Sequence, residues 1–484
     1  MRRIAIVGGG ISGLAAAFRL EQMRGKGLDL EYALFEASPY FGGVLRTEQV
    51  EGFTIEAGPD SFLTEKTWAA DFCREAGLAG EIITSNPGHR KAYILLHGCL
   101  SPIPDGFMFM APSKVLPVLR SQLFSTSTKI RMAREWFHPP RESVEDESVA
   151  SFVERHYGAE MVERVAAPLL AGVYGGDVAQ LSMQAVLPRF AAIEAQYGSI
   201  TRGMLAHRGR KPAKKTPPFT SLKNGMQQLA DAVLARLAPG SCHANCRVDA
   251  IRLMQGDEQR NERAHENDQW EISIKANFGG NAKQLFDGLI LALPAYRSAA
   301  LLQGIASRLA GELQSIPYTS SVTVALAYDS EVRSMLPAGS GFLVPQSEGK
   351  HILATTFVHN KFPHRAPAGR ALIRCFLGGA HAPEILNQSD VEILGLVKED
   401  LRQILGIATE PLLSRVFKSK AAMAQYTVGH KGRVERIEQL SRELPAFALA
   451  GNAYQGIGIP DCLLSANRAM WQVLEGLGCP MPTP

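Results

Sequence analysis

Three glycines near the start of the chain have the spacing that lets a backbone turn hold a phosphate. Gly8, Gly10 and Gly13 form a Gly-x-Gly-x-x-Gly run directly after the apolar residues 4–7. The first glycine of this pattern permits a tight turn, the second admits a pyrophosphate, and the third lets a helix pack closely on a strand. Free N–H groups at the start of that helix then attract the phosphates. The run alone is weak evidence of such a site, so the flanking elements decide its meaning.

The residues around these glycines have the order of a nucleotide-binding βαβ unit. We expect a strand at residues 3–7, a helix at 14–22 and a second strand at 31–35. Glu36 ends the second strand about twenty residues after the last glycine, where a carboxylate accepts hydrogen bonds from ribose hydroxyls. This carboxylate would repel a 2′-phosphate, which argues against NADP.

Two further junctions could contact the same ligand. Gly42 and Gly43 follow the second strand and allow close backbone approach, and Arg46 can neutralise a phosphate. Near the other end of the chain, an apolar strand at residues 447–450 leads into a glycine-rich turn and a helix at 463–474. Such a turn can aim N–H groups at an anionic or electron-rich atom. Taken alone, it is equally well explained as an ordinary turn.

Together these segments resemble the amine oxidase-like flavoprotein superfamily. Residues 41–47 resemble the continuation of its nucleotide fingerprint, and residues 56–61 resemble the segment near its flavin ring. The turn at 451–460 resembles its C-terminal motif, in which a helix start faces the isoalloxazine and stabilises negative charge on the reduced ring. Val248 occupies a position that clasps the adenine end in relatives. The resemblance implies FAD as the cofactor, bound by Gly8, Gly10, Ser12, Gly13, Glu36, Gly42, Gly43, Arg46, Gly58, Val248, Gly451, Asn452, Gly458, Ile459 and Pro460.

Other blocks resemble the porphyrinogen oxidase family within this superfamily. Residues 168–177 read PLLAGVYGGD and precede Leu181-Ser182-Met183, which is similar to the family pattern P-x-x-x-G-V-Y-x-G-D…L-S-M. Matching blocks lie at residues 61–63, 423–426, 429–430 and 456–462. Stretches at residues 101–104 and 123–127 are similar to the soluble bacterial branch that includes coproporphyrinogen III oxidase. The resemblance therefore extends from end to end of the chain.

The resemblance implies an FAD-dependent, oxygen-using enzyme of haem biosynthesis that removes six electrons from a porphyrinogen. Coproporphyrinogen III is the expected substrate, with coproporphyrin III and hydrogen peroxide as products, and protoporphyrinogen IX is the alternative. The flavin carries the redox chemistry, so no nucleophilic triad is needed and no catalytic acid or base is assigned. Another superfamily enzyme, such as an amine oxidase or carotenoid desaturase, is a more distant alternative. A flavin-binding redox sensor without turnover is the alternative from another class.

Two departures from the family pattern bear on the substrate and on flavin packing. Many protoporphyrinogen IX oxidases have an arginine where this chain has Ala92, which favours coproporphyrinogen. Relatives often have a tryptophan just before the block at residues 423–426, where this chain has Ser419-Lys420-Ala421-Ala422 and, within the block, Ala424 in place of proline. The packing around the flavin is therefore expected to differ here.

A porphyrinogen needs cations for its carboxylates and flat contacts for its ring. The candidate substrate-binding residues are Lys66, Arg90, Lys91, Gly172, Gly175, Phe357 and Tyr426. The three cations would otherwise be plain surface charges. Glycine backbone between residues 172 and 176 would let a flat ring approach, and the two aromatic residues could pack on it or belong to a core.

Composition excludes several other functions. A net charge of +4 over 484 residues, without a basic stripe, argues against nucleic acid. Seven scattered cysteines favour a reducing cytoplasm, and the Cys242–Cys246 pair lacks the second cluster that a metal site needs. The sequence has no run of eighteen apolar residues, so it predicts no transmembrane helix. The basic residues 208–215 are expected to form a solvated loop or to contact an anionic substrate or lipid head group. The sequence is compatible with a weak peripheral contact with the inner face of the cell membrane. It is also compatible with either a monomer or a homodimer.

The fold class expected from these elements is α/β, with a discontinuous Rossmann-like FAD-binding domain, a β-sheet substrate domain and a helical insert. The FAD-binding segments are residues 1–88, 216–300 and 419–484. The substrate segments are residues 89–110 and 301–418, and the insert is residues 111–215. A β-meander is expected at residues 246–293, with a polar hairpin loop at 254–268.

Overall fold

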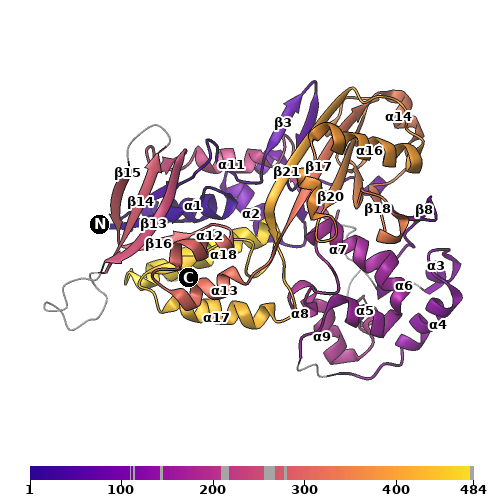
Figure 1. The fold of residues 1–484 in the computed structure, drawn as a ribbon, viewed down its shortest axis with the longest axis horizontal. Coiled ribbons are helices and arrows are strands. Elements are labelled where there is room, and N and C mark those ends of the chain that lie inside the picture. The colour runs from indigo at the N-terminus through magenta and orange to yellow at the C-terminus, as the bar shows by residue number, and fades with distance from the viewer. Residues whose placement is uncertain are drawn as a thin grey trace.

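The computed structural model describes residues 1–108, 111–112, 115–141, 145–208, 217–254, 268–276 and 281–479. The basic cluster at 208–215, except Arg208, and the loop at 254–268, except its two end residues, lie outside the described residues. Two sheet-based domains lie side by side, and a group of helices lies beside the second of them (Figure 1). Both ends of the described chain belong to the first domain, in agreement with a discontinuous nucleotide-binding fold.

A five-stranded parallel sheet forms the centre of the first domain. Its strand order is β12-β2-β1-β16-β22, and every neighbouring pair is parallel. Its strands are β1 (Arg2–Val7), β2 (Leu30–Phe35), β12 (Cys242–His243), β16 (Gly288–Leu291) and β22 (Phe447–Leu449). Ile4 and Ile6 face one core, and Ala5 and Val7 face another, so β1 is buried on both faces. Such double burial is typical of parallel sheets.

Helices cover one face of this sheet, and a β-meander covers the other. Helices α1 (Ile11–Gly25), α11 (Gln227–Leu234) and α18 (Ile459–Gly476) pack together on the first face. The meander consists of β13 (Cys246–Met254), β14 (Gln269–Ala276) and β15 (Asn281–Phe286). The expected βαβ unit is present, although α18 begins four residues before the predicted helix. The expected meander needs a correction at its end, because residues 288–291 form β16 of the parallel sheet and β15 is the third strand of the meander.

Short elements join this domain to the next. Strands β5 (Phe62–Leu63), β11 (Phe219–Leu222) and β6 (Ile82–Thr84) form a small antiparallel sheet. A hairpin is formed by β3 (Thr47–Val50) and β4 (Phe53–Glu56), and α2 (Thr67–Glu75) packs near the start of α18.

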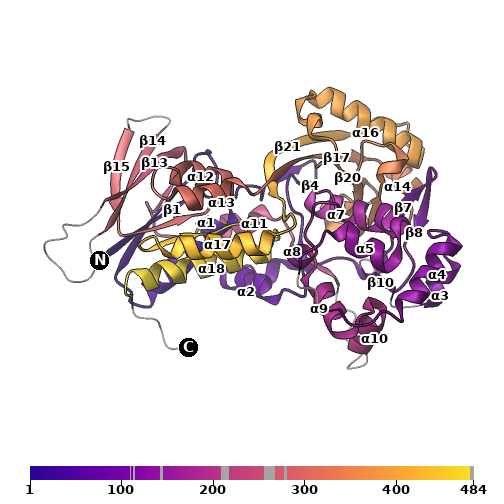
Figure 2. The same cartoon turned by 60° about the horizontal axis from the view of Figure 1, so that its bottom comes forward.

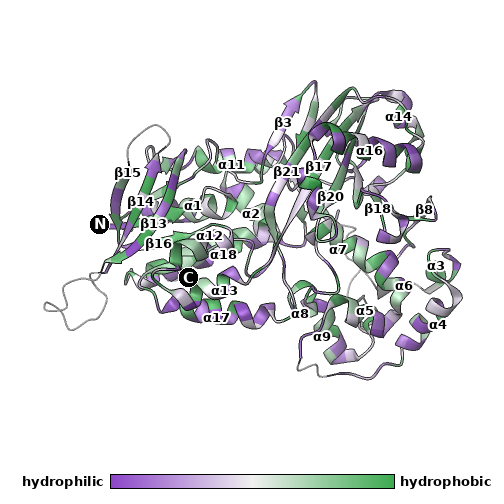
Figure 3. Ribbon diagram, in the orientation of Figure 1, coloured by the Kyte–Doolittle hydropathy of each residue, from purple (hydrophilic) through white to green (hydrophobic). Residues whose placement is uncertain are grey.

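A seven-stranded sheet forms the second domain, with strand order β21-β17-β20-β19-β18-β7-β8. Its strands are β7 (Ala92–Leu96), β8 (Cys99–Pro102), β17 (Tyr318–Tyr328), β18 (Gly341–Leu343), β19 (Ala354–Phe357), β20 (Ala371–Gly378) and β21 (Leu413–Ala424). Helices α14 (Ser330–Met335), α15 (Val358–Lys361) and α16 (Asp390–Leu405) pack around it. Its inner strands are largely hydrophobic, whereas α16 carries a hydrophilic outer surface (Figure 3).

Two predicted domain boundaries fall inside elements of the structure. Residue 300 lies within α12 (Ala295–Leu302), which packs with α13 (Ser307–Gln314) near the meander and α17 (His430–Arg442). These helices therefore belong to the first domain, and the chain enters the second at β17. Residue 419 lies within β21, whose pairing with β17 continues to Ala424. Both boundaries therefore move to the ends of these elements. Contacts between residues distant in sequence decide to which domain each element belongs.

The helical insert lies beside the seven-stranded sheet as a separate group (Figure 2). Its helices are α3 (Val115–Arg120), α4 (Thr126–Glu135), α5 (Val149–Tyr157), α6 (Ala159–Met161), a π-helical turn (Val162–Ala166), α7 (Ala167–Tyr174), α8 (Met183–Val186), α9 (Pro188–Tyr197) and α10 (Ile200–Arg208). Strands β9 (Phe107–Met108) and β10 (Ala111–Pro112) precede them. No helix in the described ranges is long and apolar enough to span a bilayer.

Charged side chains hold the centre of the insert together. His156 is fully buried, with Nδ1 at 3.2 Å from Glu135 and Nε2 at 3.1 Å from Glu194. Glu135 also accepts hydrogen bonds from the Ile200 N–H and the Ser199 hydroxyl at the start of α10. Burial alone would lower the pKa of His156, but hydrogen bonds to the two carboxylates raise it above 6.5. The imidazolium thus links α4, α5 and α9.

We predict that this imidazolium stabilises the fold in acid and loses its effect as pH rises. Because the folded pKa of His156 is raised, its contribution is complete below pH 6.5 and is lost as pH rises through the folded pKa. His156→Gln should lower the free energy of unfolding by about 3–5 kcal/mol near pH 6, since it leaves the buried Glu135 without a cationic partner, whereas Glu194 keeps Arg155. Denaturant unfolding of both proteins from pH 6 to 9 should show the difference shrinking.

The control is His351→Gln, because His351 is half exposed and lies 3.7 Å from Asp400. It should change stability by less than about 1 kcal/mol. A difference between His156→Gln and wild type that stays constant over this pH range would contradict the prediction.

Candidate functional site

The glycine turn after β1 forms a cradle beside the first turn of α1. Gly8 has a φ of +108°, and a Cβ on Gly13 would lie 1.8 Å from the Gly8 carbonyl oxygen, so neither position accommodates a side chain. Gly10 is the N-cap residue of α1 and provides no side-chain hydrogen bond. A Cβ on Gly10 would meet no atom within 4 Å, whereas one on Gly43 would lie 3.1 Å from the Gly10 Cα. Open space therefore adjoins unsatisfied helix N–H groups, which suits a pyrophosphate.

Glu36 lies beside this cradle at the carboxyl end of β2. Its Oε2 accepts a hydrogen bond from the Gly9 N–H at 2.6 Å, and its Oε1 accepts one from the Ser38 N–H at 2.7 Å. Two backbone donors orient the carboxylate and leave each oxygen able to accept another hydrogen bond. A ribose diol can supply those two donors, so Glu36 fits the role predicted from its position.

The closing turn reaches the same carboxyl edge of the parallel sheet. Gly451 follows β22 with a φ of +142°, and Gly458 is the N-cap residue of α18. Ile459 and Pro460 begin α18 and are buried. The Asn452 side chain donates to the Ala422 carbonyl at 3.2 Å, which joins the turn to β21. The N-termini of α1 and α18 therefore lie at the same edge of the parallel sheet. The residues at these two helix starts fit an FAD.

The remaining predicted cofactor residues are less constrained. Gly42 forms an isolated parallel bridge with Gly10, and Ser12 is buried in the first turn of α1. The exposed Arg46 pairs with Glu48 at 3.2 Å. Val248 is half-buried in β13, just before a bulge in its pairing with β14. Their individual roles toward FAD stay predictions.

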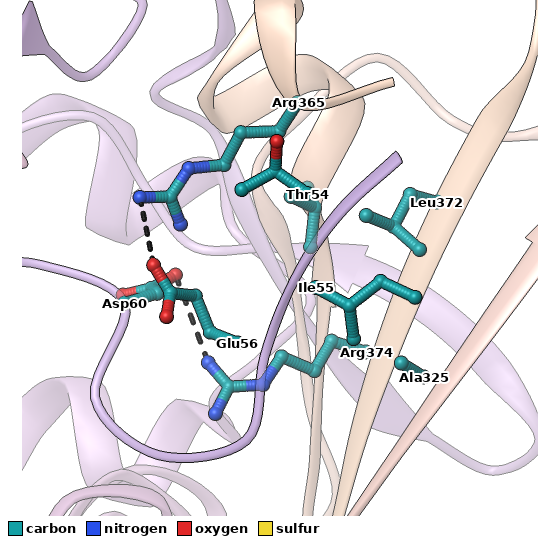
Figure 4. Close-up of a pocket in the computed structure, with 9 residues that line it drawn as sticks. Thr54, Ile55, Glu56, Asp60, Ala325, Arg365, Leu372 and Arg374 are labelled. Carbon is teal, nitrogen blue, oxygen red and sulfur yellow. Dashed lines mark ion pairs between the residues drawn. The ribbon is translucent and has the colours of Figure 1, made fainter. Parts of the chain in front are cut away.

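Buried charges surround Gly58 at the junction of the two domains. The Arg374 guanidinium donates to the Gly58 carbonyl and lies 4.0 Å from Asp60. Lys361 donates to both Asp60 oxygens at 2.9 Å, and Arg365 lies 3.0 Å from Glu56. Figure 4 shows the two arginines converging on the two carboxylates. Residues from β20, α15 and the segment after it thus hold the segment from β4 to Asp60.

The cluster has three cationic groups around two carboxylates. Burial raises the pKa of Asp60, but Lys361, Arg374 and Arg365 together lower it well below its usual range. For Glu56, burial dominates and raises the pKa despite Arg365 and a hydrogen bond from Thr47. Nε and Nη1 of Arg365 have no hydrogen-bond partner among the described residues, and a cavity of about 10 Å³ lies beside them. Such a volume accommodates one water molecule.

The structure changes the interpretation of two predicted substrate contacts. Lys66 Nζ lies 2.5 Å from Asp461 Oδ1, so its charge is already paired and it is not a free partner for a substrate carboxylate. Phe357 is completely buried in the core of the seven-stranded sheet, 6.1 Å from the Phe342 ring, so it cannot pack on a substrate. The aromatic side chain follows the alternation of β19 into the core.

The other predicted contacts lie in three places. Gly172 faces β18 and β19 from α7, and Gly175 ends α7 with a φ of +58° against Thr319. The positive φ accounts for Gly175, whereas a Cβ on Gly172 would make only ordinary contacts of 3.6 and 3.7 Å, so the role of Gly172 toward a substrate stays a prediction. Tyr426 is buried, donates to the Asn452 carbonyl at 2.8 Å and accepts from the Gly456 N–H at 2.7 Å, so it braces the closing turn.

Arg90 and Lys91 are exposed just before β7. None of the contacts described for Lys91 reaches the Gly58 segment. Their role toward a substrate stays a prediction.

Lys361 and Arg374 are not among the site residues predicted from the sequence. Arg374 stands in the apolar run ALIRCFLG of β20, and a charged residue within a buried strand indicates a paired or functional charge. That signal was available from the sequence. Lys361 carries no comparable signal, because it is one of several polar residues in a short helix.

We predict that Gly10→Ala weakens FAD binding without unfolding the apoprotein. The added methyl would occupy the open space where a phosphate approaches the backbone, whereas the protein itself has room for it. FAD affinity should fall at least about tenfold, or 1.4 kcal/mol. Apoprotein stability should change by less than about 1 kcal/mol, the usual cost of alanine at an N-cap. Flavin fluorescence titration and denaturant unfolding measure the two quantities.

Gly25→Ala is the matched control at the other end of α1, where a Cβ also meets nothing within 4 Å. It should leave FAD affinity unchanged. Equal affinities in Gly10→Ala and wild type would show that the cradle does not hold the phosphates.

Comparisons with known proteins agree with this geometry. Residues 11–474 match the flavin-containing amine oxidoreductase family. The chain is 32% identical to coproporphyrinogen III oxidase of Bacillus subtilis (strain 168) and 31% identical to that of Mycobacterium tuberculosis (strain H37Rv), with 98% of both chains covered in each case. A crystal structure from Exiguobacterium sp. 255-15, assigned as a protoporphyrinogen oxidase, shares 30% identity and a TM-score of 0.84 over 98% of this chain and 99% of that one. The chain therefore belongs to the flavin-containing amine oxidoreductase family, and the Gly10 cradle, the Glu36 carboxylate and the α18 turn are the residues predicted to hold its flavin.

Proposed function

We propose that this flavoenzyme oxidises coproporphyrinogen III to coproporphyrin III in haem biosynthesis, with molecular oxygen as the acceptor and hydrogen peroxide as the by-product. The end-to-end similarity to coproporphyrinogen III oxidases carries the proposal, because it covers both domains and the insert together. A likeness confined to the flavin domain would support flavin binding alone.

FAD, when bound, supplies the acceptor of two electrons at a time, so three cycles complete the six-electron oxidation. The chain orients this cofactor through the Gly10 cradle and the Glu36 carboxylate. Arg374 and Lys361 hold the Gly58–Asp60 segment in one position, and the substrate-domain strands thereby stay in register with the cofactor domain. Preorganised contacts of this kind are how a protein contributes when the cofactor carries the chemistry.

Ala92 supports coproporphyrinogen over protoporphyrinogen IX. It begins β7 and pairs with Gly341 of β18, and its methyl group offers no charge to a propionate. Arg90 and Lys91 stand immediately before it and are exposed. We propose that these two cations meet substrate carboxylates in place of an arginine at residue 92.

An assay of the purified holoenzyme tests this function. With oxygen present, porphyrin fluorescence should rise above autoxidation for coproporphyrinogen III, with about tenfold higher kcat/KM than for protoporphyrinogen IX, or 1.4 kcal/mol in transition-state binding. Peroxide should accumulate at three equivalents per porphyrin, one for each two-electron cycle. Oxidation of neither porphyrinogen above the autoxidation rate would overturn the proposal, and a reversed preference would assign protoporphyrinogen IX instead.

We also propose a cytoplasmic location with a weak contact to an anionic membrane surface. All seven cysteines are free thiols, as a reducing compartment allows. The segment of α3 and α4 exposes apolar side chains beside basic ones. The apolar residues are Leu116, Leu119, Ile130, Trp136 and Phe137, and the basic residues are Arg120, Lys129, Arg131 and Arg134. This combination suits the interfacial region of a bilayer.

Vesicle sedimentation tests the membrane contact. The protein should sediment with vesicles of phosphatidylglycerol and phosphatidylcholine but not with phosphatidylcholine alone, and salt should weaken binding. Phe137→Ser should reduce it several-fold, whereas Val391→Ser on α16, which is equally exposed, should not. Equal sedimentation with both vesicle types would exclude the basic residues as the cause.

A further inference from the structure

The first turn of α18 carries an ion pair that the proposed reaction leaves without a role. Lys66 Nζ lies 2.5 Å from Oδ1 and 2.6 Å from Oδ2 of Asp461. Asp461 Oδ2 also accepts a hydrogen bond from the Gly458 N–H at 3.3 Å, within the same turn. The two side chains are 28% and 13% exposed, so solvent screens their charges only partly.

The order of the parallel sheet places this pair at the flavin half of the cofactor. Glu36 ends β2 on one side of β1, and the glycine turn follows β1 itself. A dinucleotide in such a sheet lies across the carboxyl ends of the strands, at the switch point. With its adenosine ribose at Glu36, its other half extends toward the ends of β16 and β22. Helix α18 follows β22, so Asp461 belongs to that half.

The charge at this turn affects how readily the flavin gains electrons. The N-terminus of α18 carries a partial positive charge, which favours negative charge on a reduced ring. Gly458 has no side chain to satisfy the first N–H groups, and Asp461 is the acidic residue of the first turn. Its carboxylate alone would oppose the reduced flavin. Lys66, held to both of its oxygens, cancels that opposition.

We propose that the Lys66–Asp461 pair sets the reduction potential of the flavin by neutralising the carboxylate in the first turn of α18. Both are positioning residues in this role, since they act through the field at the helix start. The two charges have opposite effects, so the two single substitutions must shift the potential in opposite directions. A purely structural pair would not do this.

Redox titration of the holoenzyme with indicator dyes, without substrate or oxygen, tests the proposal. Lys66→Met leaves Asp461 uncompensated and should lower the potential, whereas Asp461→Asn leaves Lys66 uncompensated and should raise it. Each should change the ratio of reduced to oxidised flavin at a fixed poise by at least about tenfold, which is about 30 mV for a two-electron couple. The double variant should return toward wild type.

Lys398→Met is the matched control, because it removes one lysine charge from an exposed pair with Glu410. Its potential should equal that of wild type. Lys66→Arg keeps the charge and should also leave the potential unchanged. If Lys66→Met fails to retain FAD, the rise in Asp461→Asn still decides the question.

Shifts of both single variants in the same direction, or shifts no larger than that of Lys398→Met, would overturn the proposal. Because the titration uses no porphyrinogen, this result is independent of the proposed substrate.

Discussion

The structure depends on the parallel pairing of β1 with β16 and of β16 with β22. Strands β1 and β16 are separated in the chain by residues 8–287, and β22 lies more than 150 residues after β16. These pairings bring the start of α1 and the start of α18 to the same edge of one sheet. Since backbone N–H groups at both helix starts lack intrahelical acceptors, this edge has a built-in preference for anions and for electron-rich atoms. The cofactor site is a consequence of the sheet order.

The second constraint is the cluster of buried charges between the two domains. Buried ions are costly unless each has a partner, and removing one partner costs more than the pair contributes. Lys361 and Arg374 therefore require Asp60, and Asp60 in turn requires them. The mutual requirement fixes the segment between β4 and β5 relative to β20. A hydrophobic contact of equal area would tolerate sliding, whereas directed hydrogen bonds to Gly58 and Asp60 do not.

The part of the site that could be predicted from sequence is local. Gly8, Gly13 and Glu36 lie within one βαβ unit, where glycine sterics and strand ends fix the geometry over a few residues. The Lys361–Asp60 pair spans 301 positions, and no periodicity of the chain indicates it. Phe357 was ambiguous for a related reason. An aromatic residue in a strand points to one of two faces, and the elements packed on the sheet decide which core it joins; Phe357 joins the core that includes Val397 and Leu401 of α16.

The family resemblance indicates which residues lie near the flavin. It does not indicate which charged side chains among them are neutralised by an ion pair. The sequence indicates Lys66 as a candidate substrate cation or a plain surface charge, and the residue that neutralises it lies 395 positions away. The same holds for the buried cluster, in which cationic residues of another domain lower the pKa of Asp60 and keep it ionised. At both places a charged group is paired with a partner distant in sequence, but the outcome differs. The Lys66–Asp461 pair is neutral, whereas the buried cluster has three cations around two carboxylates. The two helix starts and this cluster therefore all contribute positive field, which is the field that a flavin gaining electrons requires.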